Sequence, residues 1–553
     1  MPFPLVRSIF LNRYVAFLVI AFLYIAFSPI IELTKGVWRM EIPLLLCLYG
    51  CLNFFTKPSR WQPLVAALPL AALYLGHDYY YLRFSRIPKW VEFHQLPELM
   101  GVLEPGLSLV LGAIVLVPVV LFVTCLRMPP LKSRKTALGV LLLLPIVLLL
   151  AAPVYHPKEF IQLFKRLTIE IIYYSNLINV EYNGRLATSL YNEAKRRETV
   201  QSLENFRNIE SLSLRVPEAL AQKSNGKNVH LIVMESFIDP TLLDKVPKTL
   251  QPAHPDYLKL VGNKQGFSVS PIFGGYTAQP EFEVLCGVPA FQEFDEIEFN
   301  MFTGSKTYCL PSILRSLGYV STASNAYMPE FFNTVLAYKG IDFDAVYFAR
   351  EYVPTRETYL SKGPEENNKF FFDEELFAQN LDFVKRSIEQ KKPFFNYLLT
   401  VYGHFPFELD RAGPPLFTLP ELPEAVGKII NQYHYRTKAL AGYLNRLMAL
   451  DPTALIIVVS DHLPPLPGGI GEYEKLGYFE GVADRLLINR LLVFRGGKME
   501  KLDKFAHFHI YRLILDFVTD HAYCQNLPCT FDYPVDREAY RNDYHTIMGL
   551  ASR

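Results

Sequence analysis

The sequence predicts two parts, a helical membrane domain of about five spans followed by an exported α/β domain with a mostly parallel sheet. The chain has 553 residues, too many for one compact domain. Its mean hydropathy is positive (+0.14), only 20% of its residues are charged, and the apolar excess lies before residue 156. From residue 228 onward, short apolar runs alternate with helical stretches, which is typical of a parallel sheet covered on both faces.

Charge and composition exclude two broad classes of protein. The 55 basic and 54 acidic residues give a net charge of +1. A general nucleic-acid binder needs a basic surplus to displace phosphate counterions, so that class is excluded. Aromatic residues make up 14% of the chain, which supplies core material that a disordered chain lacks.

Five apolar segments are predicted to cross a membrane: 14–33, 40–55, 62–76, 105–126 and 137–155. A crossing helix needs about 20 residues, so the second and third segments are short. Buried helices of a soluble protein are the alternative, but the uncharged run LGVLLLLPIVLLLAAPVY disfavours it. The first segment is not expected to be a cleaved signal, because further apolar segments follow without a small-residue cleavage site.

The short loops predict the orientation of these segments. Three loops carry basic residues and no acid: Arg7 and Arg13 at the N-terminus, Lys57 and Arg60 after the second segment, and Arg127, Lys132, Arg134 and Lys135 after the fourth. Basic loops stay in the cytoplasm, so the N-terminus is predicted there and everything after residue 156 outside. The predicted domains are a transmembrane domain (1–155), a helical linker (156–224) and an exported domain (225–553).

Seven strands are predicted in the exported domain: 229–235, 267–273, 319–324, 343–348, 394–401, 454–461 and 491–496. The same domain holds four cysteines, Cys286, Cys309, Cys524 and Cys529. An even number of cysteines in an oxidising compartment suggests disulfides. Of the three possible connectivities, the local pairs Cys286–Cys309 and Cys524–Cys529 are the simplest.

Polar side chains follow several predicted strands, where open α/β sheets place their functional sites. They are Glu235 (IVMESF), Thr277 (GGYTAQPEFE), His404 (VYGHFPF), and Asp461 with His462 (VVSDHLP). Each of these residues alone is weak evidence for a functional site, since an Asp-His pair after a strand is often structural. Together, two carboxylates, an imidazole and a hydroxyl form a site for one divalent cation such as Mn²⁺, Mg²⁺ or Zn²⁺.

This set also predicts a nucleophile. A metal-bound hydroxyl loses its proton more readily, and Thr277 lies where a helix is expected to begin. His404 is one loop away and is placed to bind or protonate a phosphate oxygen or a leaving group. Glu281 and Glu283 follow the nucleophile, and Glu281 is expected to be a supporting group rather than a catalytic one.

The order of ESF, a threonine followed by EFE, HFP and SDH resembles the lipoteichoic acid synthase and phosphoglycerol transferase group of the alkaline phosphatase/sulfatase superfamily. The resemblance implies one metal ion, with Mn²⁺ as the first choice of metal. Its four ligands would be Glu235, Thr277, Asp461 and His462. Thr277 would be the nucleophile and His404 a second catalytic residue. The implied enzyme lies in a bacterial inner membrane and moves phosphoglycerol from phosphatidylglycerol to an envelope glycan or lipid through a phosphothreonine. Nucleic acid is not an expected partner.

One segment departs from this family. Lipoteichoic acid synthases carry a Trp-Asn-Arg segment that contacts glycerol phosphate, and Phe332, Asn333 and Thr334 replace it here. The candidate substrate-binding residues are Asn325, Tyr327, Phe332 and Asn333. The missing arginine leaves the donor head group open. Phosphoethanolamine transfer is the nearest alternative and phosphodiester hydrolysis the next. An inactive membrane-tethered binding protein is disfavoured, because every type of metal ligand is retained. A true sulfatase is disfavoured, because Ile313 stands where the Cys-x-Pro-x-Arg motif beginning at Cys309 needs its arginine.

Overall fold

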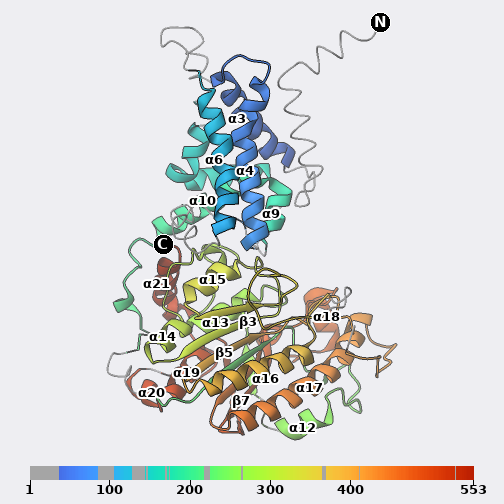
Figure 1. Ribbon diagram of the computed structural model, residues 1–553. Helices are drawn as coiled ribbons and strands as arrows, with labels where there is room; N and C mark the ends of the chain where they lie inside the picture. Colours follow the sequence, from blue (N-terminus) through green and yellow to red (C-terminus); the bar gives the residue numbers. More distant parts are fainter. Residues whose placement is uncertain are drawn as a thin grey trace. The chain divides into compact units, whose positions relative to one another are not determined.

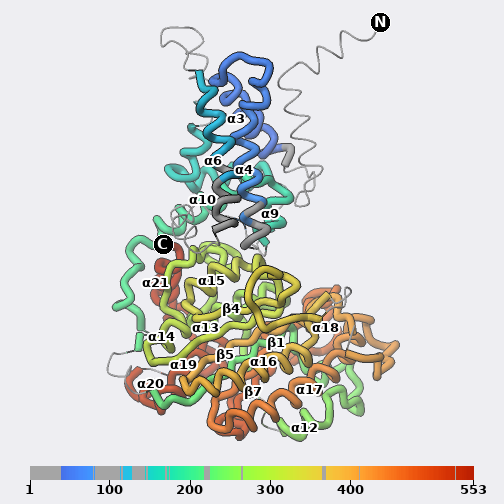
Figure 2. The backbone as a smooth tube through the Cα atoms, in the orientation of Figure 1, coloured from blue at the N-terminus to red at the C-terminus, as the bar shows by residue number. Residues whose placement is uncertain are grey.

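The computed structural model describes residues 37–553 apart from 85–86, 88–104, 128–143, 145–146, 169–170, 173–174, 214, 217–223, 263, 265, 364–368, 410–411, 528 and 530 (Figure 1). The chain divides into two compact units, Met1–Ser202 and Leu203–Arg553. The predicted helical linker, 156–224, is therefore divided between the two units. The tube in Figure 2 follows the chain through each of them.

The first unit is helical in its described part. Its helices are α3 (Ile42–Phe55), α4 (Gln62–Phe84), α6 (Pro105–Thr124), α8 (Pro157–Leu167), α9 (Asn176–Asn183) and α10 (Arg185–Ser202), preceded by the short η1 (Val37–Glu41).

Helices α3, α4 and α6 occupy the second, third and fourth segments predicted to cross a membrane, and α4 runs eight residues beyond the predicted end at residue 76. The first predicted segment lies outside the described residues, and the fifth is described only in part. Among the helices that the structure describes, none combines the length and the apolar character that crossing a membrane requires.

Buried charged groups fix the start of α10 within this unit. The carboxylate of Glu41 accepts hydrogen bonds from the backbone N–H groups of Leu186 and Ala187, each at 3.0 Å. A carboxylate is favourable there because the first N–H groups of a helix lack helical partners and carry partial positive charge. Beside it, Arg185 binds Asp78 of α4 through two hydrogen bonds of 2.7 Å. Arg185 and Ala187, in the middle of the predicted linker, are thus buried within the first unit.

The second unit is built on a nine-stranded sheet. Its strands are β1 (Val229–Met234), β2 (Gly266–Val269), β3 (Val320–Asn325), β4 (Ala345–Phe348), β5 (Phe394–Leu399), β6 (Leu455–Ser460), β7 (Ile488–Arg495), β8 (Lys498–Glu500) and β9 (Phe505–Ala506). The order is β4-β3-β5-β1-β6-β7-β2-β9, and β8 pairs with β7. Strands β4, β3, β5, β1 and β6 are parallel, whereas β7 is antiparallel to β6, β2 and β8. The predicted α/β class is confirmed, but the sheet is mixed, because every pairing of β7 is antiparallel.

Helices cover both faces of this sheet (Figure 1). The helices described in this unit are α12 (Pro255–Val261), α13 (Ala278–Cys286), α14 (Leu310–Ser316), α15 (Thr334–Ile341), α16 (Asp373–Glu389), α17 (Glu424–Leu450), α18 (Gly469–Leu476), α19 (His509–Val518), α20 (Ala522–Asn526) and α21 (Arg541–Ala551).

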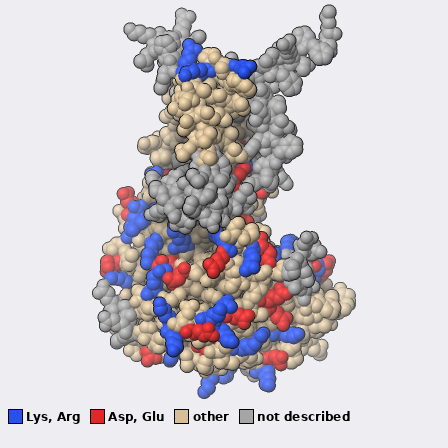
Figure 3. Space-filling view, viewed as in Figure 1, with Lys and Arg blue, Asp and Glu red and all other residues tan. Residues whose placement is uncertain are grey.

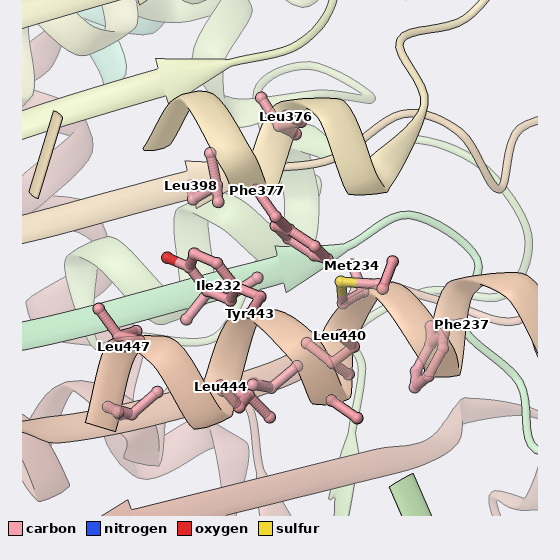
Figure 4. Close-up of a cluster of buried hydrophobic side chains, with 14 of the residues drawn as sticks. Ile232, Met234, Phe237, Leu376, Phe377, Leu398, Leu440, Tyr443, Leu444 and Leu447 are labelled. Carbon is pink, nitrogen blue, oxygen red and sulfur yellow. The ribbon is translucent and has the colours of Figure 1, made fainter. Parts of the chain in front are cut away.

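Successive side chains along each strand point to opposite faces of the sheet, and each face packs into its own core. On one face, Ile232 and Met234 of β1 belong to a buried cluster with residues of α16 and α17, including Phe377 and Leu444 (Figure 4). On the opposite face, Tyr397 of β5 reaches α13 and α15. Each fully buried large apolar side chain contributes about 1.5–3 kcal/mol, and these two cores hold the strand ends in fixed positions.

Both local disulfides predicted from the cysteine spacing are confirmed. Cys286, the last residue of α13, bonds to Cys309, which precedes α14, and Cys524 bonds to Cys529. The first disulfide ties the helix that begins at Thr277 to the helix that leads into β3.

The surface charge of the second unit is mixed. Acidic and basic side chains alternate over the face shown in Figure 3, without a continuous region of one sign. This distribution agrees with the net charge of +1.

Candidate active site

The parallel pairing of β1 and β6 brings two acidic residues together. Met234 lies opposite Ser460 in the sheet register, so the residues that follow, Glu235 and Asp461, leave the same edge side by side. One ligand atom each from Glu235, Asp461 and His462 lies within 4.8 Å of the others, and all three residues are buried.

Thr277 joins this cluster from a third segment. After β2, the chain passes through Gly274, Gly275 and Tyr276 with φ values of 60°, 93° and 55°, and α13 begins after Thr277. Glycine adopts such left-handed backbone at no steric cost. The Thr277 hydroxyl lies 3.3 Å from Glu235 Oε2 and 3.5 Å from His462 Nε2. The structure therefore brings together all four residues that the sequence suggested as metal ligands.

The hydrogen bonds of His462 show that this cluster suits a cation. Its Nδ1 lies 2.9 Å from the carbonyl oxygen of Leu463, which can only accept, so the ring proton of the neutral imidazole lies on Nδ1. Nε2 accepts from the N–H of Gly275 at 3.1 Å and faces Asp461 Oδ2 at 3.2 Å. That carboxylate oxygen is buried, and no group in the described part of the chain forms a hydrogen bond with it. Two such acceptor atoms in close contact are compatible with a shared positive ion.

The electrostatics of the cluster also favour a bound cation. Burial and the neighbouring Glu235 raise the pKa of Asp461 to about 7 when no ion is present. The other oxygen of Asp461 is fully used, since Oδ1 accepts from the backbone N–H groups of Ser236 at 2.7 Å and His462 at 2.6 Å. Oδ2 is thus the oxygen left for a ligand.

Several supporting residues had no signal in the sequence. Ser236, with φ of 49°, donates to Glu235 Oε1 at 2.7 Å, and Thr400 accepts from the Glu235 N–H at 3.0 Å. Behind them, Arg436 of α17 pairs with Asp373 of α16 at 2.7 Å, and both side chains are buried. These residues lie in ordinary helical or strand-end contexts, so only the folded chain shows that they support Glu235.

The glycine before His404 is required by close packing. A β-carbon on Gly403 would lie 2.2 Å from the Glu235 carbonyl oxygen and 2.2 Å from Arg436 Nη1. Both contacts are far shorter than van der Waals distance, and the first is to backbone. The loop after β5 can therefore approach β1 only with glycine at this position.

His404 lies outside the four-residue cluster, on an exposed loop. Its ring is stacked on Tyr327, with centroids 6.2 Å apart and planes at 18°, and Phe370 lies 5.1 Å away. Nδ1 lies 2.9 Å from the carbonyl oxygen of Phe405, so Nδ1 carries the proton and Nε2 is the atom left for chemistry.

The four predicted substrate-binding residues have different surroundings. The amide of Asn333 donates to the carbonyl oxygens of Phe299 at 2.6 Å and Phe302 at 2.9 Å, and Asn325 Oδ1 accepts from the Tyr327 N–H at 2.8 Å. These amides stabilise the loop itself. Phe332 is half-buried, and Tyr327 is the member of the set that contacts His404.

Glu281 occupies the position expected of a supporting group. It is buried on α13 and accepts hydrogen bonds from the hydroxyls of Tyr338 and, at 2.7 Å, Tyr397. Burial raises the pKa of Glu281 to about 7. These contacts tie the helix after Thr277 to α15 and β5.

Comparison with known proteins agrees with this geometry. The sulfatase family model matches residues 227–509, just over half of the chain. A putative cyclic beta-1,2-glucan modification protein of Rhizobium meliloti is 31% identical over 262 residues, covering 46% of this chain and 38% of that protein. A lipoteichoic acid synthase of Staphylococcus aureus is 26% identical over 287 residues, covering 50% of this chain and 39% of that protein. This chain thus matches about two fifths of each relative's length.

Among solved structures, the phosphoglycerol transferase GacH of Streptococcus pyogenes, in complex with sn-glycerol-1-phosphate, matches with a TM-score of 0.46 and 16% identity, covering 64% of this chain and 92% of that one. Because the family model spans the whole sheet and every residue of the candidate site, the chain belongs to the sulfatase family, in the superfamily of the lipoteichoic acid synthases and phosphoglycerol transferases that its motifs resemble.

Proposed function

We propose that the chain is a metal-dependent transferase that moves a phosphoglycerol head group from phosphatidylglycerol to an envelope glycan or lipid through a phosphothreonine at Thr277. One observation carries the proposal. The Thr277 hydroxyl lies within 3.5 Å of both Glu235 Oε2 and His462 Nε2, beside the unpaired oxygen of Asp461. A hydroxyl in such a cluster is placed to act as a nucleophile.

The reaction proceeds in two displacements. Thr277 Oγ1 passes its proton to Glu235 Oε2, which lies 3.3 Å away, and forms a bond to the phosphorus, while the bond from phosphorus to the diacylglycerol oxygen breaks. His404 Nε2, when protonated, is placed to give that oxygen its proton, so that diacylglycerol leaves as an alcohol. An acceptor hydroxyl then attacks the same phosphorus and gives its proton to His404 Nε2. The bond from phosphorus to Thr277 breaks, and Thr277 Oγ1 takes its proton back from Glu235 Oε2.

The residues that would hold the metal are Glu235, Thr277, Asp461 and His462. Their oxygen and nitrogen atoms suit Mn²⁺, which we take as the native ion, although Mg²⁺ and Zn²⁺ also accept such ligands. When bound, a divalent ion lowers the pKa of a coordinated hydroxyl and stabilises negative charge on phosphate oxygens. The chain itself adds the N-terminus of α13, which begins directly after Thr277 and favours anions.

The relatives' names support the choice of acceptor. One is named for modification of a cyclic beta-1,2-glucan and the others for synthesis of lipoteichoic acid, and both are products of the bacterial envelope.

We propose that the protein lies in the bacterial inner membrane with five spans, a cytoplasmic N-terminus and an exported catalytic domain. Support comes from α6, where Leu116, Val120 and Val123 are more than half exposed, and from the two disulfides. An active periplasmic reporter fused after residue 156 is expected, and a reporter active only in the cytoplasm would contradict this topology.

Phosphoethanolamine transfer from phosphatidylethanolamine is the nearest alternative, because it needs the same nucleophile and metal. Two further alternatives rank below it: hydrolysis that releases the head group to water, and a non-catalytic binding role. The decisive experiment is mass spectrometry of the purified chain, quenched after incubation with Mn²⁺ and donor lipid in the absence of acceptor. A head-group phosphate adduct on the peptide that carries Thr277 is expected, and its mass distinguishes glycerol from ethanolamine.

Variants assign the roles. Thr277→Ala should form no adduct, whereas Thr277→Ser keeps a hydroxyl and should still form one. Asp461→Ala should lose bound metal together with the adduct, and His404→Ala should keep the metal but form the adduct slowly. Full turnover by Thr277→Ala would refute the proposed nucleophile.

A further inference from the structure

A cavity of about 340 Å³ in the second unit has no role in the proposed chemistry. Its polar wall is formed by Asp484, Tyr533 and Arg537, none of which belongs to the candidate active site. Asp484 is exposed, so the cavity opens to solvent, and its volume is typical of sites for small molecules. The apolar side chains that line it include Val269, Leu487, Ala506 and Val535.

The sheet places this cavity at the same edge as the candidate active site. β7 is antiparallel to both β6 and β2, and β9 is parallel to β2, so β2 and β9 run in the same direction as β6. Val269 and Ala506 end β2 and β9, and Leu487 directly precedes β7. All three therefore lie at the edge where Asp461 follows β6. Adjacent strands lie about 4.8 Å apart, so β2 is roughly 10 Å from β6, on the side away from β5 and His404.

Two hydrogen bonds fix the position of Arg537. Its Nη2 donates to Glu283 Oε1 at 3.0 Å and to the carbonyl oxygen of Ala290 at 3.1 Å. Glu283 is fully buried on α13, the helix that begins directly after Thr277. Within the described residues, Nε and Nη1 of Arg537 form no hydrogen bond, and neither atom is fully buried. Arg537 thus brings unused N–H donors to the cavity.

Asp484 supplies an acceptor on the same wall. Its Oδ2 accepts a hydrogen bond from the Tyr533 hydroxyl at 2.6 Å, and no other described group donates to this carboxylate. Asp484 and Arg537 line one cavity without pairing with each other. Glu283 offsets the charge of Arg537, and the ammonium group of Lys504 lies 4.4 Å from the centre of the Tyr533 ring. Neither sign of charge therefore dominates among these groups.

This arrangement favours a neutral ligand with several hydroxyl groups. A phosphate that pairs with Arg537 would face the carboxylate of Asp484, and an ammonium group at Asp484 would face the guanidinium of Arg537. A hydroxyl can both donate and accept, so neighbouring hydroxyls of one sugar can accept from Arg537 and donate to Asp484. The apolar part of the wall suits the C–H groups of a sugar ring, since small-molecule sites combine apolar walls with a few polar groups.

We propose that the cavity is a carbohydrate-binding subsite that holds one neutral sugar of a glycan acceptor. Another sugar of the same glycan would then present its hydroxyl to the phosphorus, because a short oligosaccharide spans the distance from β2 to β6. That this sugar belongs to an acceptor rests on the proposed function, whereas the binding of sugar by the cavity does not. The subsite favours a glycan over a lipid as the acceptor.

Binding measurements without donor lipid test the subsite. Calorimetry on the full chain would use neutral glucose trisaccharides that differ in linkage, with sn-glycerol-1-phosphate as the anionic comparison. At least one trisaccharide should bind the wild-type chain. Asp484→Gly, which suits the left-handed backbone at this position (φ 56°), should weaken that binding about tenfold or more, because a hydrogen bond to a charged group is lost. Val535→Trp, which places a large ring at a half-buried position in the wall, should abolish it.

Asp532→Gly is the matched control, since Asp532 is exposed, adjacent to Tyr533 in the chain and not part of the cavity wall. It removes the same charge and should leave the affinity unchanged. No binding by any trisaccharide, or binding that neither Asp484→Gly nor Val535→Trp weakens, would overturn the proposal. So would a glycerol phosphate affinity that Val535→Trp removes, since that pattern reports an anion site. Sugar binding without a Thr277 adduct would refute the transferase but retain the subsite, whereas an adduct without sugar binding would do the reverse.

Discussion

The buried ion pair between Arg436 and Asp373 allows a quantitative test of how the site is supported. Arg436 Nε lies 2.7 Å from Asp373 Oδ2, and the two side chains are 3% and 0% exposed. Replacing Arg436 with methionine preserves much of the side-chain volume but leaves a carboxyl buried without a cation. Burial already raises the pKa of Asp373, and Arg436 is the group that opposes this effect.

The expected cost follows from this geometry. Removing one partner of a fully buried ion pair typically destabilises a protein by about 3–5 kcal/mol, while replacing both partners with apolar residues is often nearly neutral. Arg436→Met should therefore lose about 3–5 kcal/mol, and Arg436→Met with Asp373→Leu should recover most of it. Metal affinity should also fall in the single variant, because Arg436 Nη2 lies 3.5 Å from Thr400 Oγ1, which binds the Glu235 N–H.

The assay must report on the second unit alone. All three tryptophans, Trp38, Trp61 and Trp90, precede it, so tryptophan fluorescence is unsuitable. Pulse proteolysis in urea, with the protected fragment of the second unit quantified on gels, measures its free energy of unfolding directly. A single variant within about 0.5 kcal/mol of wild type, or a double variant as unstable as the single one, would refute the reasoning.

Three further predictions follow from other features of the second unit. Cys286→Ala with Cys309→Ala opens a disulfide that spans 23 residues and should cost about 3 kcal/mol in the same assay, whereas equal stability of oxidised wild type and variant would contradict a stabilising role. Burial raises the pKa of Glu298 to about 7, so the folded chain holds a proton that the unfolded chain releases near its ordinary pKa of 4.5, and stability should fall as pH rises from about 4.5 through 7. Glu298→Gln should reduce that fall by roughly 2–3 kcal/mol, and an unchanged pH profile would show that this carboxyl is not responsible. Dialysis against EDTA should abolish transfer and lower the thermal midpoint, with Mn²⁺ restoring both, and activity that survives complete metal removal would contradict the proposed centre.

The strands of the sheet could be predicted because their pattern is strong. β1, β5 and β6 are six-residue strands with every residue buried, which appear in the sequence as near-continuous apolar runs. The pattern does not reveal strand direction, so the strand predicted at 491–496 corresponds to β7, but its antiparallel direction was not predicted. β8 and β9, with three and two residues, are too short to give a pattern. The predicted strand 267–273 ends early, at Val269, because the chain turns there into the glycine loop that carries Thr277.

The residues of the candidate site differ in how clearly the sequence indicates them. Glu235, Asp461 and His462 follow apolar strands directly, and parallel strands fix where their side chains emerge. Arg436 and Asp373 lie within helices whose sequences read as ordinary amphipathic segments. Their pairing depends on how α16 and α17 pack on the sheet, which a single sequence does not encode locally.

The fold shows what the segment that differs from lipoteichoic acid synthases does in this chain. Thr334 stands where those enzymes have arginine, and it is 2% exposed, with its hydroxyl donating to the carbonyl oxygen of Phe331 at 2.6 Å. A threonine held in this way cannot supply a cation to a phosphate. In the proposed transferase, the positive charge that faces the phosphate would therefore have to come from the metal ion, the N-terminus of α13 and His404.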